Sequence, residues 1–348
     1  MTATLIENRP LIALTMGDAA GIGPEVLLKA VLDPELQTLY RPLIVGHPAV
    51  MQRALNSMGR KLTLKSVDYP QQALAVADGE VACWNPCRDE VADVPLGAND
   101  GRAGRAAYDC LVAAAHAALR GEVDGITTAP LSKAALRLAG LHYPGHTEIL
   151  AEVCGVKEFG MMLYLPRGEF VKSPYGLGVV HTTLHTSIRS VPDLLTPAGI
   201  AEKIRLMHDF MRRVGSSQPR VAVCALNPHA GEEGLFGDEE SRLIRPAVEA
   251  CRVDGIDAFG PFPTDTLMRR AVYGEFDGVV AMYHDQGHIA LKLIAFDRAV
   301  NVTLGLPIIR TSPSHGTAFD IAGQNKASAD GMREAIRVAA LLSRHPSC

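Results

Sequence analysis

The sequence predicts an α/β fold with mostly parallel strands and two domains, on three observations. The chain has 348 residues, which exceeds the usual size of one core and suits two domains of ordinary size. Apolar, β-branched runs of strand length alternate along the chain with segments of helical periodicity. Several of these runs end in a Gly-rich or polar turn before the next helical segment, which is typical of parallel β-α units.

The first half of the chain supplies three strand-like runs and three helical segments. "LIALTM" precedes a Gly-rich turn and a helix that begins at Pro24 and Glu25, and "PLIVG" precedes the helical "PAVMQRALNSMG". "GRAAYDCLVAAAHAALRG" has a helical pattern, and "DGITTAP" indicates a strand that runs into a loop. Three further runs in the second half are apolar before they turn polar, namely "YGLGVVHTTLH", "RVAVCALNPHAGEEG" and "FDGVVAMYHDQGH". No internal repeat or long linker interrupts this order.

Charge and composition exclude two classes of partner. The chain carries 34 lysine and arginine residues against 38 aspartate and glutamate residues, and the two signs are interspersed. This balance gives no basic surface for nucleic acid, and no basic amphipathic stretch or bilayer-length apolar run predicts membrane binding. The amino-terminal stretch lacks the regions of a secretory signal. We therefore expect a cytoplasmic protein whose partners are small molecules or other copies of itself.

Seven cysteines are scattered along the chain, an odd number that fits a reducing compartment better than a disulfide framework. Only Cys83 and Cys87, in "CWNPC", are close together in the sequence. A four-thiolate metal site needs a second pair of this kind. We therefore interpret "CWNPC" as a structural turn.

Three histidines follow three of the strand-like runs. His185 closes "VVHTTLH", His229 follows "VAVCALNP" and His284 follows "VVAMY". The carboxyl ends of parallel strands meet at the edge of an open α/β sheet where ligands bind. Neutral imidazoles that converge there suit Zn²⁺ or a similar divalent ion, with a fourth position left for substrate. A single histidine is more often a hydrogen-bonded structural residue, so the shared placement of the three carries this prediction.

Neighbouring residues extend the predicted metal site. Asp285 and Asp265 could each accept the second ring N–H of a ligating histidine, although a turn or capping role is equally open for either. We do not expect His181 and His288 to bind the metal directly. His181 lies within or near a strand end, and His288 is one turn beyond the third predicted ligand.

A lysine, an amide and an arginine follow the last predicted ligand within 26 residues, at Lys292, Asn301 and Arg310. Arginine binds planar anions bidentately, whereas lysine acts as a point charge. Beside a metal, this combination predicts a substrate that carries phosphate and carboxylate. Singly, each basic residue could equally be a surface charge.

The Gly-rich turn "MGDAAGIGPEV" is not a dinucleotide-binding fingerprint. After Gly21 and Gly23 the third glycine position is occupied by Val26, and the next strand ends in "LIVGHP" without an acidic residue. A nicotinamide cofactor, if one binds, is therefore not held in the ordinary Rossmann manner.

Seven motifs spread over residues 16 to 323 together resemble one family. In order they are "MGDAAGIGPE", "PGHTE", "LNPHAGEEGLFGDEE", "GPFPTDT", "MYHDQGH", "NVTLGLPIIRTS" and "SHGTAFDIAG". They resemble the 4-hydroxythreonine-4-phosphate dehydrogenase (PdxA) family. The resemblance implies the fold of isocitrate and isopropylmalate dehydrogenases, with two α/β/α domains, a cleft between them and a homodimer whose sites are completed across the interface. On this basis we predict a discontinuous domain of residues 1–135 and 295–348, and a second domain of residues 136–294 with the metal, substrate and dimer residues.

The resemblance also assigns roles to residues. The family's metal ligands fall on His185, His229 and His284, the same three histidines that follow the strands. Its substrate contacts fall on "PGHTE" and on the three residues after the last ligand, and the loop "HGTAFDIAG" corresponds to the adenosine-binding loop of the dehydrogenase fold. The substrate-binding residues are therefore predicted to be His146, Thr147, Lys292, Asn301 and Arg310, and the cofactor-binding residues His315, Gly316, Thr317 and Asp320.

The implied reaction is oxidation of the C3 hydroxyl of a 4-phosphorylated four-carbon hydroxy acid by NAD, with NADP as the alternative, followed by decarboxylation of the β-keto acid. Zinc is the expected metal, with Mg, Mn or Co as alternatives. Lys292 is the predicted catalytic residue, as an anion anchor or a proton shuttle. "GLFGDEE" and "DQGHIALKL" look more like the branch acting on 4-phospho-D-threonate or 4-phospho-D-erythronate than the branch acting on 4-phosphohydroxy-L-threonine.

Two other functions stay open. A metal-dependent hydrolase could use the same histidines to activate water, but it has no reason to carry the "HGTAFDIAG" loop. A dihydrodiol dicarboxylate dehydrogenase of the same family acts on a substrate without phosphate, and the presence of "PGHTE" argues against it. The stretch 166–176, "PRGEFVKSPYG", is expected to form a hairpin.

Overall fold

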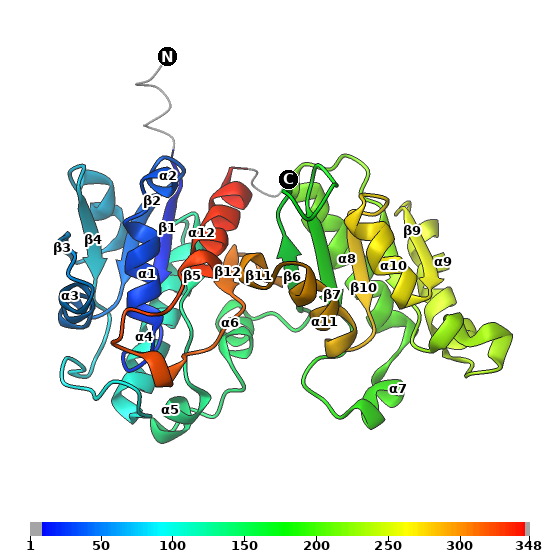
Figure 1. Ribbon diagram of the computed structural model, residues 1–348, viewed down its shortest axis with the longest axis horizontal. Coiled ribbons are helices and arrows are strands. Elements are labelled where there is room, and N and C mark those ends of the chain that lie inside the picture. Colours follow the sequence, from blue (N-terminus) through cyan, green and yellow to red (C-terminus); the bar gives the residue numbers. More distant parts are fainter. Residues whose placement is uncertain (1–8, 345–348) are drawn as a thin grey trace, which may run out of the picture. The chain divides into compact units, whose positions relative to one another are not determined.

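The computed structural model describes residues 9–344 (Figure 1). The described residues up to Lys157 form a compact unit together with Leu306–Arg344, here called unit 1, and Glu158–Gly305 form unit 2. Each unit contains a sheet flanked by helices, so the predicted α/β fold class is confirmed. The predicted domain limits stay a prediction, and their ends at 1–8 and 345–348 lie outside the described residues.

The sheet of unit 1 is parallel throughout, with the strand order β3, β4, β2, β1, β5, β12. Its central strand β1 is completely buried because helices cover both faces of the sheet, which explains its continuous apolar sequence. The strands are β1 (Leu11–Thr15), β2 (Arg41–Val45), β3 (Thr63–Val67), β4 (Glu80–Trp84), β5 (Gly125–Thr128) and β12 (Arg310–Pro313).

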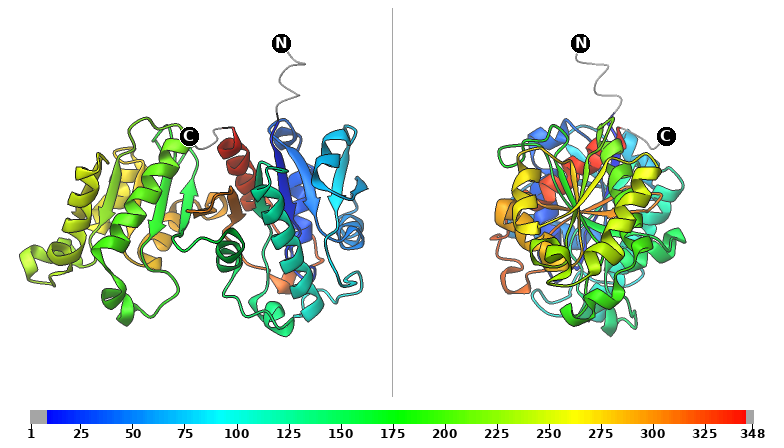
Figure 2. Two further views of the ribbon diagram at one scale, coloured as in Figure 1. Left: turned by 180° about the vertical axis from the view of Figure 1, so that it is seen from behind. Right: turned by 90° about the vertical axis from the view of Figure 1, so that its right-hand side faces the viewer.

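The helices of unit 1 lie on both faces of this sheet. Views from front and back show α1 and α12 on one face and α4 on the other (Figures 1 and 2). Helix α4 begins where Asp100 caps it by accepting a hydrogen bond from the Arg102 amide at 2.8 Å. The helices are α1 (Gly23–Val31), α2 (Pro34–Gln37), α3 (Pro48–Ser57), α4 (Gly101–Leu119), α5 (Lys133–Leu138), α6 (His146–Cys154) and α12 (Asp330–Ser343).

The sheet of unit 2 has the strand order β11, β6, β7, β10, β8, β9. Strand β6 runs antiparallel to both of its neighbours, and the pairs from β7 to β9 are parallel. The prediction of mostly parallel strands is therefore confirmed for the chain. The strands are β6 (Gly160–Leu165), β7 (Leu177–His181), β8 (Val221–Cys224), β9 (Ala258–Phe262), β10 (Gly278–Ala281) and β11 (Val300–Leu304).

Four longer helices flank the sheet of unit 2, with α8 and α9 on one face and α10 and α11 on the other (Figures 1 and 2). The core beneath α10 and α11 is built from aliphatic and aromatic side chains such as Leu267, Leu291 and Phe276. The helices are α7 (Val191–Leu194), α8 (Pro197–Val214), α9 (Arg245–Val253), α10 (Thr264–Val272) and α11 (His284–Ala295).

The stretch 166–176, expected to form a hairpin of its own, contains no strand and is instead the loop that connects the antiparallel strands β6 and β7. It is anchored to unit 2 by the buried Ser173, whose hydroxyl donates a hydrogen bond of 3.0 Å to Asp277. Tyr164 closes the loop from the strand by donating its hydroxyl hydrogen to the Tyr175 carbonyl at 2.7 Å.

Among residues 9–344, no helix has both the length and the apolar character to cross a bilayer.

Candidate functional site

In unit 2, a hollow of about 510 Å³ lies between the segment after β7 and the start of α11. Two of the three predicted metal ligands, His185 and His284, line it, and their ring centroids are 5.7 Å apart. Tyr283, Thr186 and Ser187 add further polar groups to its wall. The hollow therefore offers two imidazoles and several hydroxyls to one bound molecule or ion.

The positions of the predicted ligand histidines relative to their strands differ in part from the prediction. Strand β7 ends at His181, so His185 lies in the following loop instead of at the strand end. The loop leaves the sheet after Thr183. The hydroxyl of this residue donates a hydrogen bond of 2.8 Å to the carbonyl of Met282, the residue directly after β10. His284 fits the prediction better, because it is the first residue of α11 and follows β10 closely.

Asp285 lies beside His284, as the sequence suggested. The His284 Nδ1 and Asp285 Oδ1 atoms are 2.6 Å apart, so the carboxylate can accept the Nδ1 hydrogen and leave the Nε2 lone pair available for a ligand. The other predicted supporting residue, Asp265, accepts a hydrogen bond from the adjacent Thr266 amide at 2.9 Å in the first turn of α10.

Behind His284, two further histidines form a hydrogen-bonded pair. His181 Nε2 and His288 Nδ1 are 3.0 Å apart, and His181 Nδ1 lies 3.3 Å from the Met161 carbonyl oxygen. A carbonyl can only accept, so His181 donates from Nδ1 and accepts at Nε2, and His288 donates from Nδ1. The His288 ring is stacked on that of His284 with centroids 3.8 Å apart and planes 11° apart.

The electrostatics keep this pair uncharged. Burial, opposed by the hydrogen bond to the Met161 carbonyl, lowers the pKa of His181 to about 4. Burial and the nearby His181 lower the pKa of His288 to about 3. Both rings are therefore neutral near pH 7, and they place a packed surface behind His284 without adding positive charge to the hollow.

Gln286 fixes the first turn of α11 to its neighbours. Its side chain accepts a hydrogen bond from the Met282 amide at 2.7 Å and donates to the Ala225 carbonyl at 2.7 Å and the Thr264 hydroxyl at 3.0 Å. The helix that carries His284 is thus tied to the segments that follow β8 and β9.

The third predicted ligand, His229, lies in a turn with an uncommon backbone. Residues 229–233 all have positive φ angles, between 46° and 79°, and four of these five residues are not glycine. Such a run is strained and persists only when its surroundings hold it. The buried Glu240 fixes the residues that lead into the run by accepting hydrogen bonds from the Leu226 and Asn227 amides at 2.8 and 2.7 Å.

The chemistry of the predicted donor set suits a divalent metal, since it consists of imidazoles that can be neutral and of carboxylates next to them. Within residues 9–344, however, no group of three or more His, Cys, Asp or Glu side chains is arranged to hold a metal ion. His185 and His284 thus face a common hollow, whereas the prediction that His229 joins them stays a prediction.

Two predicted substrate residues of unit 2 have distinct surroundings. Lys292 is half-buried on α11, two turns after His284, and its ammonium lies 5.5 Å from the centroid of the Phe296 ring. Asn301 lies in β11, and its side-chain oxygen is buried without a hydrogen-bond partner. A buried unpaired acceptor is costly, so this oxygen is suited to a donor on a bound molecule.

In unit 1, Arg310 and His146 meet at the end of β5. The buried guanidinium of Arg310 donates to the Thr128 hydroxyl from Nε at 3.2 Å and from Nη2 at 2.8 Å. The His146 ring donates from Nε2 to the carbonyl of the next residue, Ala129, at 3.2 Å. Burial and the positive charge of Arg310 hold the pKa of His146 well below its usual value.

The same end of β5 lies next to the start of α6, whose first residues are His146 and Thr147. The free amides of a helix amino terminus and a buried guanidinium both favour an anion. The arrangement therefore provides one arginine and a helix terminus for a phosphate or carboxylate.

The four predicted cofactor residues lie in the loop after β12, which rests on the Gly-rich turn after β1. The Thr317 carbonyl accepts a hydrogen bond from the Ile22 amide at 3.0 Å. A Cβ atom on Gly21 would lie 2.9 Å from that carbonyl oxygen, so only glycine permits this approach. Glu25 accepts from the Gly323 amide and, at 3.1 Å, from the Asn325 amide. The Gly-rich turn after β1, which lacks the dinucleotide-binding fingerprint, therefore supports the predicted cofactor loop and is not itself the predicted cofactor site.

The sequence analysis missed Asp18 in this turn. Its side chain is fully buried, one oxygen accepts from the Ala20 amide at 2.9 Å, and the other accepts no hydrogen bond from any residue between 9 and 344. Burial raises its pKa to about 6. An aspartate between glycine and alanine after a strand is also a common turn residue, so the sequence alone gave no reason to single it out.

Comparisons with known proteins point to one family. The family model described as "Pyridoxal phosphate biosynthetic protein PdxA" matches residues 38–339. The 4-hydroxythreonine-4-phosphate dehydrogenase of Geobacter metallireducens is 45% identical over 97% of this chain and 96% of its own. The D-threonate 4-phosphate dehydrogenase of Salmonella typhimurium is 42% identical over 95% of this chain and 98% of its own. The crystal structure of 4-hydroxythreonine-4-phosphate dehydrogenase from Klebsiella pneumoniae superposes with a TM-score of 0.83 at 42% identity, covering 96% of this chain and 99% of that one.

Proposed function

Because the chain belongs to the PdxA family, we propose that it is a dehydrogenase that oxidises a hydroxyl of a small 4-phosphorylated hydroxy acid. The observation that carries this proposal is the match, at 42–45% identity over nearly the whole chain, to dehydrogenases named for two such substrates. We further propose NAD as the oxidant and a β-keto acid, which then loses CO₂, as the first product.

In this proposal His185, His229 and His284 hold a divalent metal, with zinc expected. The bound metal supplies Lewis-acid polarisation of the substrate hydroxyl. The shared hollow of His185 and His284 supports the proposal, as does the contact of Asp285 with the Nδ1 atom of His284, which leaves Nε2 available. The strained turn at His229 is typical of residues held for function.

The anionic ends of the substrate need groups that bind and orient them. We assign this role to Arg310, His146 and Thr147 in unit 1, and to Lys292 and Asn301 in unit 2. The buried Arg310 is held by two hydrogen bonds to one hydroxyl, so it loses little rotamer freedom when an anion binds. Asn301 offers its unpaired amide oxygen to a substrate hydroxyl. Lys292 is the candidate for moving a proton to or from the reacting carbon chain.

We place the nicotinamide cofactor on the loop with His315, Gly316, Thr317 and Asp320. The support is that this loop is fixed on the Gly-rich turn after β1 by several backbone hydrogen bonds. A loop that is positioned before the cofactor arrives costs less ordering entropy on binding.

We also propose that the protein acts as a homodimer in a reducing compartment such as the cytoplasm. Helix α11 exposes Ile289 and Leu293, and the residue directly after it exposes Phe296; the three are 63%, 87% and 57% exposed and follow one another at helical spacing. Such an apolar stripe suits burial against a second copy. The cysteines at 83, 87, 110, 154, 224 and 251 are free, as expected where thiols stay reduced.

The test is NADH formation by the metal-loaded protein with 4-phospho-D-threonate, 4-phospho-D-erythronate and 4-phosphohydroxy-L-threonine side by side. We expect turnover of at least one substrate, lost on chelation and in His229→Ala. His208→Ala is the matched control, because His208 lies on α8 in the same unit and its ring pairs with the adjacent Asp209. The substrate with the highest kcat/KM assigns the chain to one branch of the family. The two relatives come from different branches and are similar to the chain to nearly the same degree.

Failure to reduce NAD or NADP with all three substrates, in protein shown to bind metal, would contradict the proposed phosphorylated substrate. The assay would then turn to dihydrodiol dicarboxylates. Hydrolysis of a phosphate ester without nucleotide reduction would instead favour a metal-dependent hydrolase.

A further inference from the structure

Two cysteines far apart in the sequence lie side by side in unit 1. Cys87 is in the loop after β4, and Cys110 is in the middle of α4. Their sulfur atoms are 3.5 Å apart. Formation of a disulfide needs sulfurs about 2.05 Å apart, so a shift of about 1.5 Å, shared between a loop residue and a rotatable thiol, would connect them.

The two thiols differ in exposure to solvent. Cys87 is half-buried, whereas Cys110 is completely buried. The hydrogen bond with Cys87, together with burial, raises the pKa of Cys110 well above its usual value. An oxidant from solution therefore reaches the Cys87 thiol first. The buried Cys110 thiol is in contact with Cys87 and can react with it in a second step.

The third cysteine of this region, Cys83, is engaged elsewhere. Its thiol is buried in β4 and donates to the Gly46 carbonyl at 3.5 Å. Burial raises the pKa of Cys83 to about 12. The pair that is set to react is thus Cys87 with Cys110, and not the pair Cys83 and Cys87 that is adjacent in sequence.

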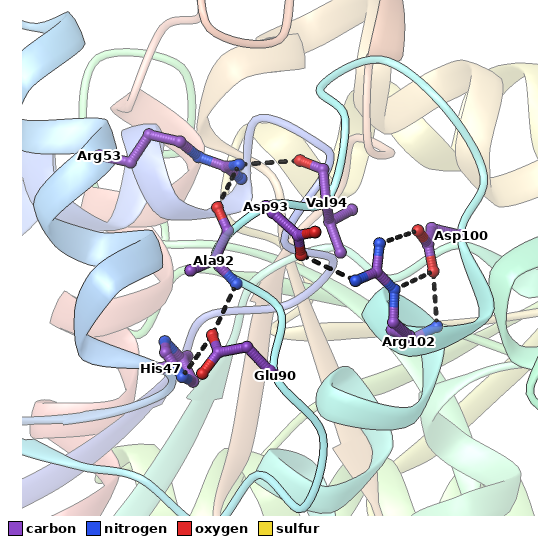
Figure 3. Close-up of polar contacts among 8 residues, drawn as sticks. All are labelled: His47, Arg53, Glu90, Ala92, Asp93, Val94, Asp100 and Arg102. Carbon is purple, nitrogen blue, oxygen red and sulfur yellow. Dashed lines mark hydrogen bonds and ion pairs between the residues drawn. The ribbon is translucent and has the colours of Figure 1, made fainter.

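The long segment between the two cysteines is held in place by other contacts (Figure 3). Arg53 donates to the Ala92 and Val94 carbonyls at 3.0 and 2.8 Å, and Arg102 pairs with Asp93 and Asp100 at 2.7 and 2.9 Å. The two sulfurs therefore lie together because the segment is already folded over α4, without needing a covalent link.

This segment also touches the turn that supports the predicted cofactor loop. The Gly97 amide donates to the Ala20 carbonyl at 2.8 Å. Leu96 lies so close to Gly323 that a Cβ atom there would be 2.5 Å from the leucine Cδ1. A covalent ring closed at Cys87 and Cys110 would therefore contain residues that contact both the Gly-rich turn and the cofactor loop.

We propose that Cys87 and Cys110 form an oxidation site that a peroxide converts into an intramolecular disulfide. The Cys87 thiolate attacks one peroxide oxygen and breaks the O–O bond, giving a sulfenic acid and, with a proton, water. The Cys110 sulfur then attacks the Cys87 sulfur, forms the S–S bond and releases the hydroxyl as a second water with the Cys110 proton. Two thiols and one hydrogen peroxide thus give one disulfide and two water molecules, and a thiol reductant reverses the change.

The first test maps disulfides in the full-length protein after treatment with hydrogen peroxide and blocking of free thiols. We expect one linked peptide pair that joins Cys87 to Cys110 and disappears after dithiothreitol. The only tryptophan of the sequence, Trp84, lies three residues before Cys87 and should report the change as a reversible loss of fluorescence. A link from Cys83 to Cys87, or irreversible oxidation of Cys87 without any link, would overturn the proposal.

Variants separate the two steps. In Cys110→Ser the sulfenic acid on Cys87 has no partner, so a dimedone label on Cys87 should rise several-fold over wild type. In Cys87→Ser both the link and the fluorescence change should be lost. Cys154→Ser is the control, because Cys154 is also half-buried and free but lies on α6. Equal dimedone labelling of wild type and Cys110→Ser would show that Cys110 does not resolve the sulfenic acid.

Discussion

Gly287, in the first turn of α11, offers a quantitative test of how this helix packs. A Cβ atom at this position would lie 2.5 Å from His181 Nε2 and 2.7 Å from Val179 Cγ1. Favourable contacts of this kind lie at about 3.5–4.0 Å. The substitution Gly287→Ala therefore forces either the helix or the His181 ring to move by roughly 1 Å, and the hydrogen bond between His181 and His288 is the contact that the movement breaks first.

Two opposing effects set the size of the change. Alanine in place of glycine in a helix interior favours folding by about 1 kcal/mol. Overpacking costs about 1–3 kcal/mol, and a buried hydrogen-bonding group left without a partner costs about 1–3 kcal/mol more. We therefore expect Gly287→Ala to lower the free energy of unfolding by about 1–5 kcal/mol in spite of its better helix propensity.

Urea unfolding followed by circular dichroism measures this difference. The matched control is Gly331→Ala in the first turn of α12, where the nearest atom to the added Cβ is Pro313 Cβ at 3.2 Å and the helix propensity gain is the same. We expect the control to lie between the stability of wild type and about 1 kcal/mol above it, because the helix propensity gain is opposed only by this milder contact. If Gly287→Ala were as stable as the control, the close packing of α11 on His181 described above would be refuted.

Three further predictions concern other residues. Arg310→Lys loses the two hydrogen bonds to Thr128 and should raise KM for the phosphorylated substrate about 10–100-fold in initial-rate assays, as expected for a loss of about 1.5–3 kcal/mol. His229→Ala should reduce zinc affinity in a chelator competition about 100-fold while the melting temperature stays within about 1–2 °C, because the side chain is exposed. Burial raises the pKa of Asp18 in the folded protein to about 6, above the ordinary value of 3.8, so the stability that its protonated form contributes is present at pH 4 and is lost as the pH rises through 6. This loss is about 3 kcal/mol, and Asp18→Asn should remove that part of the pH dependence in urea unfolding at pH 4 and pH 7.

The sequence predicted the elements well where a short pattern decides them. The apolar runs before the Gly-rich turn, before His229 and before His284 became buried parallel strands, because a strand covered on both faces needs a continuous apolar sequence. The sequence predicted the position of His185 less well. The run "GLGVVHTTLH" reads as one strand, but β7 ends at His181, since the threonines after it bond to the neighbouring segment and lead the chain out of the sheet.

Contacts between distant segments could not be predicted from the sequence, for a physical reason. The left-handed turn at residues 229–233 has non-glycine residues at four of five positions, and the buried Glu240, further along the chain, fixes the two residues that lead into it. The proximity of Cys87 and Cys110 likewise depends on how a long segment folds over α4. Local propensity predicts neither the left-handed turn nor the proximity of the two cysteines, because both depend on tertiary contacts.

The turn "HDQGH" shows why a cluster of polar residues need not be a cluster of ligands. Of its five residues, only His284 borders the hollow with an available ring nitrogen, and Asp285 sets the orientation of that ring. Gln286 instead ties the helix to two neighbouring segments, and Gly287 leaves room for the histidine of the adjacent strand. His288 is neutral and packs against the ring of His284. Substitution of the glutamine or the glycine should therefore disturb the folding of α11 as well as any chemistry at His284, and the two effects can be separated only by measuring stability alongside activity.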